Sequence, residues 1–263
     1  MDGMIEMEAV YILKKVWIKA FFFFVLMGWH LVSFEVQCQQ VYDVWEGGRI
    51  LYENDFSIPD QLEDWKMEGP GKTEFKEGWM HMYSPDEEWH HVYWCPMDFP
   101  ESFAAEWEMQ NMNPDAGLCI VFFAARGING EDIFDPLLPE RDGTFKYYTR
   151  DRLNSYHISY YANNPKNQER EASHLRKNNM FEIMQTGPEG IAKHSTAIHH
   201  IRLVKDGARI AMSIDGKKII DWTDDGKIHG PVYGGGKIGF RQMQWSYFRY
   251  RNFKVREING TGR

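Results

Sequence analysis

The sequence predicts an all-β fold, a sandwich of two antiparallel sheets, and the C-terminal part carries the observations that indicate it. Apolar residues alternate through 199–205 and lead directly into Asp206-Gly207, and a second pair, Asp215-Gly216, ends the next alternating run. Asp-Gly between such runs is a strong hairpin signal, because both turn positions tolerate positive φ. We therefore expect strands at 199–205, 208–215 and 217–222 and, after a Gly-rich loop, at 236–242 and 247–257.

The upstream part continues as short strands separated by turns. Phe103 to Gln110 alternates, with apolar residues on one face and two glutamates and a glutamine on the other. Gly117 to Ala125 is a continuous apolar run, which indicates a central strand buried on both faces. Residues 126–155 show no clear strand, and ordered connections of that length are often functional. Further strands are expected at 49–54, 72–76, 79–83, 90–94, 156–161, 174–177 and 181–185, with a loop at 65–71.

The N-terminal residues have the pattern of a secretion signal. Three lysines at positions 14, 15 and 19 precede a short apolar segment, Ala20 to Gly28, which is too short for a comfortable membrane span. We expect residues 1–38 to be a cleaved signal peptide and residues 39–263 to form one sandwich domain of a secreted or periplasmic protein. Two alternatives stay open: an uncleaved anchor, and lipidation of Cys38, although Glu-Val-Gln before it is a poor lipobox.

Charge and motifs leave several function classes without support. The net charge is −8 and no basic stacking platform is visible, which argues against nucleic acid as a partner. The sequence has no Gly-x-Ser-x-Gly elbow, phosphate-binding loop or dinucleotide fingerprint, so an esterase, a kinase and a dehydrogenase have no support. No HExxH is present either, and we expect no cofactor. Without CxxC a zinc ribbon is excluded, whereas Cys95 and Cys119 could form a disulfide or remain free thiols.

Seven stretches share their residue pattern with a known family. They are Trp65–Gly69, Trp94–Pro96, Gly117–Ala125, Gly130–Pro136, His157–Tyr160, Leu175–Lys177 and Gly236–Met243. On these motifs the chain resembles, from about Leu51 to Val255, the uncharacterised bacterial family called domain of unknown function 1961, which includes a protein of the rhamnogalacturonan-utilisation cluster of soil bacilli. The resemblance implies a concanavalin A-like lectin/glucanase jelly roll and a role in the breakdown of acidic plant or algal polysaccharide, but no particular reaction.

Hydrolysis is one chemistry that such a sandwich could carry. Glu106 and Glu108 alternate on one strand, so their side chains project from one face about 6.5–7 Å apart. Glycosidases need two carboxyl groups ~5–5.5 Å apart for retention or ~6.5–9.5 Å apart for inversion. The third position of the alternation is an amide, Gln110, and a solvated outer face explains the same pattern.

The long connection contains three acids within five residues. Glu131, Asp132 and Asp135 could bind a hard cation such as calcium, but EF-hand spacing is absent, so a structural calcium is only weakly indicated and no metal residues are assigned. Alternatively, Asp135 caps a turn before Pro136 while Glu131 and Asp132 point into a cleft. We assign Glu131 to the candidate catalytic residues and the two aspartates to substrate binding.

β-Elimination is the second chemistry. Along 156–161, alternation places His157, Ser159 and Tyr161 on one face and Tyr160 on the other. A histidine with a nearby phenol can remove a proton α to a carboxylate and protonate the leaving oxygen. We therefore predict His157 as the base and Tyr160 or Tyr161 as the acid, although an ordinary hydrogen-bonded histidine fits the same pattern.

Elimination also needs a cation to neutralise the substrate carboxylate. Arg176 and Arg241 are the predicted clamps, since a guanidinium pairs bidentately with a uronate. Arg241 alternates with core-facing residues and so projects outward. The other predicted substrate-binding residues are Arg126, Gln242 and Trp94. Arg126 stands where the family relative has a small residue.

Two main functional hypotheses stay open. One is a secreted lyase acting on acidic plant or algal oligosaccharides. The other is a non-catalytic, lectin-like protein that binds sugar through aromatic stacking and arginine contacts, with hydrolysis by Glu106 and Glu108 as a further alternative. Each implies an oligosaccharide or polysaccharide ligand, and neither implies contact with a membrane beyond the signal or a lipid anchor.

Overall fold

The computed structural model describes residues 48–85, 90–163 and 170–258, which form one compact unit. The expected signal peptide and Cys38 lie outside these residues. In the described part of the chain, no helix is long and apolar enough to cross a membrane.

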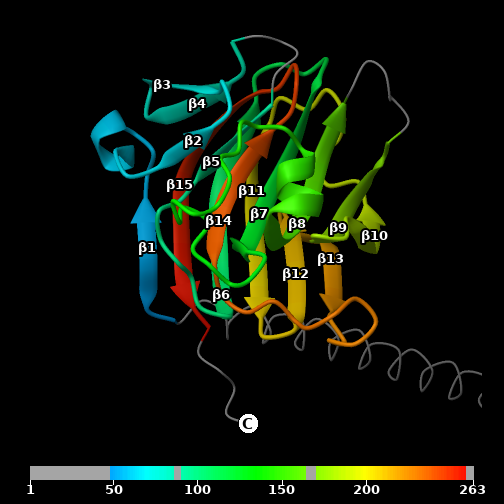
Figure 1. Cartoon of the computed structure of the whole chain (residues 1–263). Helices are drawn as coiled ribbons and strands as arrows, with labels where there is room; N and C mark the ends of the chain where they lie inside the picture. The colour runs from blue at the N-terminus through cyan, green and yellow to red at the C-terminus, as the bar shows by residue number, and fades with distance from the viewer. Residues whose placement is uncertain (1–47, 86–89, 164–169, 259–263) are drawn as a thin grey trace, which may run out of the picture. The chain divides into compact units, whose positions relative to one another are not determined.

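Two antiparallel sheets face each other (Figure 1), which confirms the predicted sandwich. The first sheet has eight strands, and β1 (Ile50–Asn54) pairs with β15 beside its main path. Its order is β13 (Lys217–Thr223), β12 (Arg209–Ile214), β11 (Ile198–Asp206), β6 (Ser102–Asn111), β15 (Tyr247–Glu257), β4 (Trp79–Tyr83) and β3 (Lys72–Lys76).

The second sheet has seven strands. Its order is β10 (Glu182–Pro188), β9 (Ala172–Asn178), β8 (Leu153–Asn163), β7 (Gly117–Gly127), β14 (Lys237–Gln242), β5 (His91–Trp94) and β2 (Lys66–Glu68). Two short helical segments complete the described elements: a 3₁₀ turn at Pro59–Leu62 and a π-helix at Tyr147–Asp151. Strand β2 falls within the predicted loop at 65–71, because three residues are too few to display an alternating pattern.

The main core lies between the sheets and follows the predicted alternation. Phe103, Ala105, Trp107 and Met109 of β6 all point into it. Cys95 and Cys119 are buried there as free thiols, which settles the open choice between a disulfide and free thiols.

A second, smaller apolar cluster lies on the outer face of the seven-stranded sheet. There the connection between β7 and β8 folds back over the sheet (Figure 1). Its Ile133 and Tyr148 belong to one apolar cluster with Trp94 and Phe122. Strand β7 is therefore buried on both faces, as its continuous apolar sequence predicts. Gly143 permits the close approach, since it has a φ of +93° and a Cβ there would lie 2.0 Å from the carbonyl oxygen of His90.

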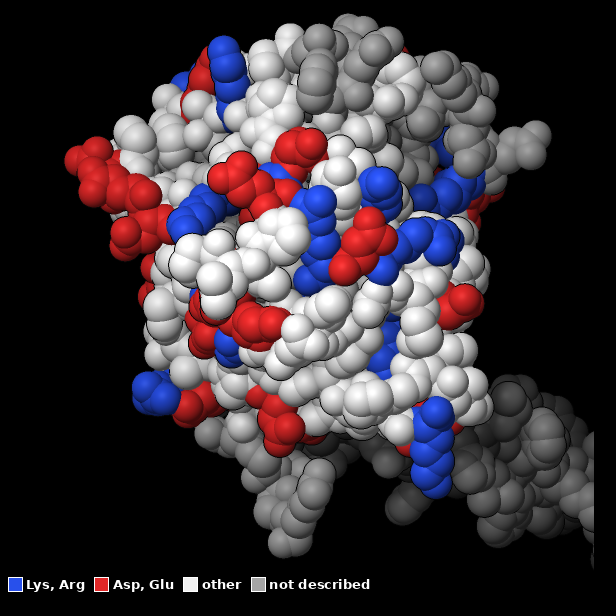
Figure 2. All heavy atoms as spheres, in the orientation of Figure 1, with Lys and Arg blue, Asp and Glu red and all other residues white. Residues whose placement is uncertain are grey.

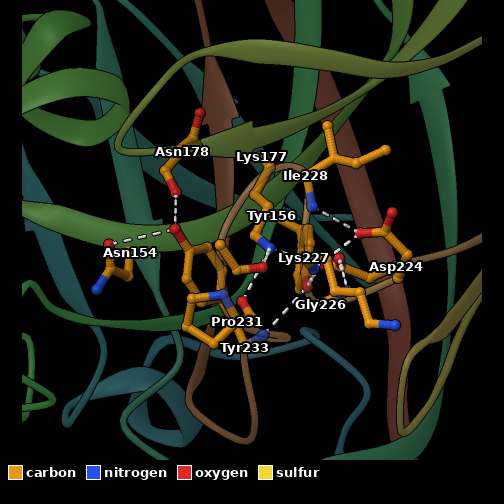
Figure 3. A network of polar contacts seen from close by, with 12 residues as sticks. Asn154, Tyr156, Lys177, Asn178, Asp224, Gly226, Lys227, Ile228, Pro231 and Tyr233 are labelled. Atoms are coloured by element: carbon orange, nitrogen blue, oxygen red, sulfur yellow. Dashed lines mark hydrogen bonds and ion pairs between the residues drawn. The ribbon is translucent and has the colours of Figure 1, made fainter.

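A buried polar network fixes the connection between β13 and β14 (Figure 3). Lys177 Nζ lies 2.7 Å from Asp224 Oδ2 and also donates to the carbonyl oxygens of Gly230 and Pro231. The hydroxyl of Tyr156 donates to the same aspartate. These bonds tie the connection to strands β8 and β9.

Candidate functional site

Strand register places the chemically interesting side chains on the outer face of the seven-stranded sheet. One row across β5, β14, β7, β8 and β9 consists of Trp94, Gly239, Phe122, His157 and Arg176. The next row contains Val92, Arg241, Ile120, Ser159 and His174. Because residues directly opposite one another on neighbouring strands share a face, these two rows form one continuous surface.

His157 lies at the centre of this surface, beneath the β7–β8 connection. It is fully buried, its Nδ1 lies 3.1 Å from Asn178 Oδ1, and its ring packs edge-on against Phe122 at 5.2 Å. Burial, followed by the positive charge of Arg176, lowers the pKa of His157 to about 3. The imidazole is therefore neutral at physiological pH and is positioned by packing.

Arg241 projects outward, as predicted, but the β7–β8 connection covers it. Its Nη2 donates to the carbonyl oxygen of Gly143 at 3.0 Å, and its guanidinium lies 4.7 Å from the ring of Phe145 and 5.2 Å from that of Tyr148. The side chain is fully buried, and its Nε and Nη1 have no hydrogen-bond partner among the described residues. Burial lowers the pKa of Arg241 to about 10, so it keeps its charge.

Two further arginines border the same surface near β8 and β9. Arg176 donates from Nη1 to the carbonyl oxygen of Phe181 at 2.9 Å and lies over that ring at 4.1 Å. Arg170 donates from Nη2 to the hydroxyl of Ser159 at 2.7 Å. Both side chains are half-buried, and burial lowers the pKa of each.

The positive charge of these three arginines is not neutralised by a carboxylate in the described part of the chain. Each guanidinium donates to a carbonyl or hydroxyl oxygen, and aromatic rings orient two of them. Glu182 is the one acid that raises the pKa of Arg176, without forming an ion pair. Buried charges are normally paired, so the guanidinium of Arg241 is unusual, whereas Arg170 and Arg176 are partly open to solvent. Figure 2 shows Lys and Arg side chains around the π-helix, with acidic side chains among them.

Tyr160 and Tyr161 lie on the other side of the sheet. The register between β7 and β8 shifts at this point, so that Cys119 is opposite Tyr161 but Ile120 is opposite Ser159. This bulge turns both tyrosines into the core, where the hydroxyl of Tyr160 contacts Cys119 Sγ and that of Tyr161 accepts from Asn111. The expectation that Tyr161 shares a face with His157 is therefore wrong.

Trp94 and Gln242 are also buried rather than presented to solvent. Trp94 lies under Tyr148, and its Nε1 donates to Glu68 Oε2 at 3.0 Å. The same carboxylate receives Arg141 in a bidentate ion pair. Gln242 faces the main core and donates from Nε2 to the hydroxyl of Tyr250 at 3.2 Å.

The acidic residues of the long connection form turns and ion pairs. Glu131 accepts from the backbone and side chain of Asn129, and Asp135 accepts from the backbone N–H of Leu137. Asp132 Oδ2 lies 3.0 Å from Lys237 Nζ. Among residues 48–85, 90–163 and 170–258, no group of three or more His, Cys, Asp and Glu could hold a metal ion.

Arg126 lies at the end of β7, away from the other arginines of the candidate site. Its Nη2 forms an ion pair with Asp98 Oδ2 at 2.8 Å. Its charge is thus compensated within the protein.

Glu106 and Glu108 lie on the opposite side of the molecule, on the outer face of the eight-stranded sheet. They line a cavity of about 250 Å³ together with His200 and Lys254. Glu108 receives Arg251 at 2.6 Å, and His200 Nε2 lies 4.0 Å from Glu106. This cavity is separated from the arginines by the whole thickness of the sandwich.

Several residues of the candidate site were not predicted from the sequence. Tyr148 and Phe145 belong to the long connection, whose aromatic content was the available signal. Arg170 and Phe181 carried none, because they join the site only through pairing of β8, β9 and β10.

Comparison with known proteins identifies the family. A family model described as a domain of unknown function (DUF1961) matches residues 49–255. The chain belongs to this family. A relative called uncharacterized protein YesU, from Bacillus subtilis, is 36% identical over 219 residues, which are 81% of this chain and 98% of the relative.

Solved structures confirm the fold of this DUF1961 protein. The crystal structure of a Bacillus subtilis protein of unknown function with a galectin-like fold is 36% identical, with a TM-score of 0.77, and the match covers 80% of this chain and 96% of the other. The exoplasmic/lumenal domain of VIP36, in a Ca²⁺/Man3GlcNAc-bound form, matches with a TM-score of 0.57 at 12% identity, over 82% and 92% of the two chains. At that identity the likeness concerns the fold alone.

Proposed function

We propose that this protein is a lectin-like binder of acidic oligosaccharides and that Arg170, Arg176 and Arg241 recognise the negative charge of the sugar. The observation that carries the proposal is the absence of a carboxylate partner for these three arginines among the described residues. A uronate carboxylate supplies the missing partner, since a guanidinium pairs with it bidentately.

The three arginines have different parts in this proposal. Arg176 and Arg170 are half-exposed, so they contact the ligand directly, with His174 beside them in the adjacent row. Arg241 is covered by the β7–β8 connection and acts through its electric field on the ligand, which is weakly screened because the guanidinium is buried. The exposed Arg150, 5.0 Å from the ring of Phe181, adds to the same potential.

Proteins of the same fold include ones named for carbohydrate recognition, which supports the proposal. Structures of the same fold include one called the carbohydrate recognition domain of Emp46p and a Crh5 transglycosylase in complex with NAG. One of these names describes a binding domain and the other an enzyme. Whether this protein binds sugar or also acts on it therefore has to be argued from its own side chains.

The side chains favour binding over β-elimination. Elimination needs a base and an acid that converge on one point of the substrate. Here His157 and Tyr160 lie on opposite faces of β8. In addition, burial lowers the pKa of His157 to about 3, so it would be a weak base at neutral pH.

Titration calorimetry with oligogalacturonates and with their methyl esters tests the proposal. The acidic form should bind, its affinity should fall with salt, and the neutral ester should bind much more weakly. Arg176→Gln should lower the affinity about 10- to 100-fold, since a hydrogen bond between charged groups contributes about 1.5–3 kcal/mol. Arg49→Gln, which removes an equal charge beside β1 of the other sheet, is the matched control.

Four outcomes would contradict this function. Equal binding of the acidic and neutral sugars, or equal loss in both variants, would exclude recognition by the arginines. Ultraviolet absorbance of an unsaturated uronate would restore the elimination hypothesis. Release of reducing ends without that absorbance would direct attention to Glu106 and Glu108.

A further inference from the structure

A serine, a histidine and an aspartate form a hydrogen-bonded chain away from the three arginines. Ser195 Oγ lies 2.8 Å from His199 Nε2, and His199 Nδ1 lies 2.6 Å from Asp215 Oδ2. Because an ionised carboxylate can only accept, Nδ1 carries the ring proton and Nε2 is left to accept from the serine hydroxyl. This order of contacts is that of a Ser-His-Asp triad, in which the base activates the nucleophile and the acid orients the base.

The histidine of this chain is held by the sandwich itself. His199 lies in β11 directly opposite Met109 of β6, whose side chain is in the main core. Its side chain therefore points toward the space between the sheets and is only 12% exposed. Packing thus fixes the imidazole of His199 in the folded protein. Its contact with Asp215 therefore costs little side-chain entropy, unlike an ion pair between two solvated surface side chains.

The aspartate is fixed by the turn between β12 and β13. Asp215 has a φ of +51°, its Oδ1 accepts from the backbone N–H of His200 at 2.8 Å, and its own N–H donates to the carbonyl oxygen of His200 at 2.8 Å. One carboxylate oxygen is thereby anchored to the strand while the other faces His199.

The serine lies in the connection between β10 and β11, next to a strained residue. His194 has a φ of +62°, which a non-glycine residue rarely adopts. Ser195 Oγ also accepts from the N–H of Ala197 at 3.3 Å, a long bond that caps the turn. A turn-capping role of Ser195 would not require His199 to contact Asp215 through its other ring nitrogen. The N–H of Thr196 has no acceptor in the described part of the chain, whereas its carbonyl accepts from Gln110.

We propose that Ser195, His199 and Asp215 form an acyl-transfer centre that cleaves small esters such as acetyl esters. Ser195 Oγ attacks the carbonyl carbon and His199 Nε2 takes its proton. The bond to the alcohol oxygen then breaks, and His199 returns the proton to the departing alcohol. Water, deprotonated by His199, attacks the acyl-serine, so that a carboxylic acid leaves and Ser195 is regenerated. The N–H of Thr196 is the donor available to the oxyanion. Ser195 is half-buried and His199 is only 12% exposed, so the space at the hydroxyl suits a short acyl group.

The test uses the full chain with a fluorophosphonate probe and with p-nitrophenyl acetate. We expect one probe molecule per chain, located at Ser195 by peptide mass analysis, and a burst of about one equivalent of nitrophenol. Ser195→Ala should abolish both signals. Asp215→Asn, which suits the positive φ, should slow acylation about 10²- to 10⁴-fold because it favours the wrong histidine tautomer.

A matched control separates this centre from an ordinary surface serine. Ser102→Ala removes a hydroxyl that bonds Asp206 at 3.1 Å without any histidine and should leave labelling unchanged. Circular dichroism should show that each variant keeps its strand content. The proposal is overturned if the folded wild-type chain is not labelled, if Ser195→Ala is labelled equally, or if Asp215→Asn acylates at the wild-type rate. Ser195→Ala should bind oligogalacturonate as the wild type does, so failure of the arginine site would be recognised separately.

Discussion

Replacement of Lys177 by methionine should be among the most destabilising single changes in this protein. The ammonium group is completely buried and makes three bonds, to Asp224 Oδ2 and to the carbonyl oxygens of Gly230 and Pro231 (Figure 3). Asp224 is itself only 1% exposed in its side chain. Methionine is of similar length, so the change removes the charge and the donors with little change in packing.

The magnitude follows from what the aspartate retains. After the substitution its partners are the hydroxyl of Tyr156 and the backbone N–H of Gly226, while its negative charge stays buried. Removal of one partner from a buried ion pair typically costs about 3–5 kcal/mol. We expect the free energy of unfolding of Lys177→Met to fall by that amount.

Urea unfolding measures this difference, with Lys205→Met as the matched control. Lys205 is also fully buried, but within the described ranges its ammonium donates only to the carbonyl oxygens of Glu101 and Gly207. Its loss leaves no buried acid unpaired and should cost about 1–2 kcal/mol. In a double-mutant cycle, Asp224→Asn should cost much less in the Lys177→Met background than alone. A loss below about 1 kcal/mol in Lys177→Met, or full additivity in the cycle, would refute the reasoning.

Two further predictions concern the outer face of the seven-stranded sheet. Arg241→Met should leave the free energy of unfolding within about 1 kcal/mol or raise it, because it removes a buried charge without a paired acid, yet it should weaken oligogalacturonate binding in calorimetry. A loss above about 3 kcal/mol would instead show that the guanidinium holds the β7–β8 connection in place. Stability should also fall below about pH 6.5: burial lowers the pKa of His157 from 6.5 to about 3, so the unfolded chain binds more protons between these values. Between pH 7 and 4.5 this residue should account for about 2–3 kcal/mol, and urea unfolding of His157→Gln should lose correspondingly less. An unchanged pH dependence in that variant would contradict the assignment.

Local patterns in the sequence predicted most of the fold. Strands β3, β4 and β15 begin and end at the predicted residues, because alternation and the flanking turns define them without help from tertiary structure. The burial of β7 on both faces was also visible, since only a continuous apolar run satisfies two apolar surfaces. What covers its outer face was not visible, because the covering connection has no regular period of its own.

The candidate site was predictable only where a strand keeps its alternation. His157 and Arg241 lie on the expected face for that reason. Tyr161 does not, because a bulge shifts the register by one residue and no turn residue marks it in the sequence. The contact of His199 with Asp215 follows from the β11–β12 hairpin, whose register continues past Ile214 and places Asp215 opposite His200. The approach of Ser195 to His199 was hidden, because Ser195 lies in the irregular connection between β10 and β11.

The position of the β7–β8 connection also has a consequence for the order of folding. It packs on Trp94, it donates to Glu68 through Arg141, and it accepts from Arg241, although these partners belong to strands far away in the sequence. The connection can therefore dock only after β2, β5 and β14 have joined the sheet. Docking of the connection thus marks the completion of this part of the sheet. Until that moment the rings of Trp94 and Phe122 face water on an unfinished sheet. A nascent chain that stalls there would be prone to aggregate, and the exposure ends only once β14, late in the sequence, has joined the sheet.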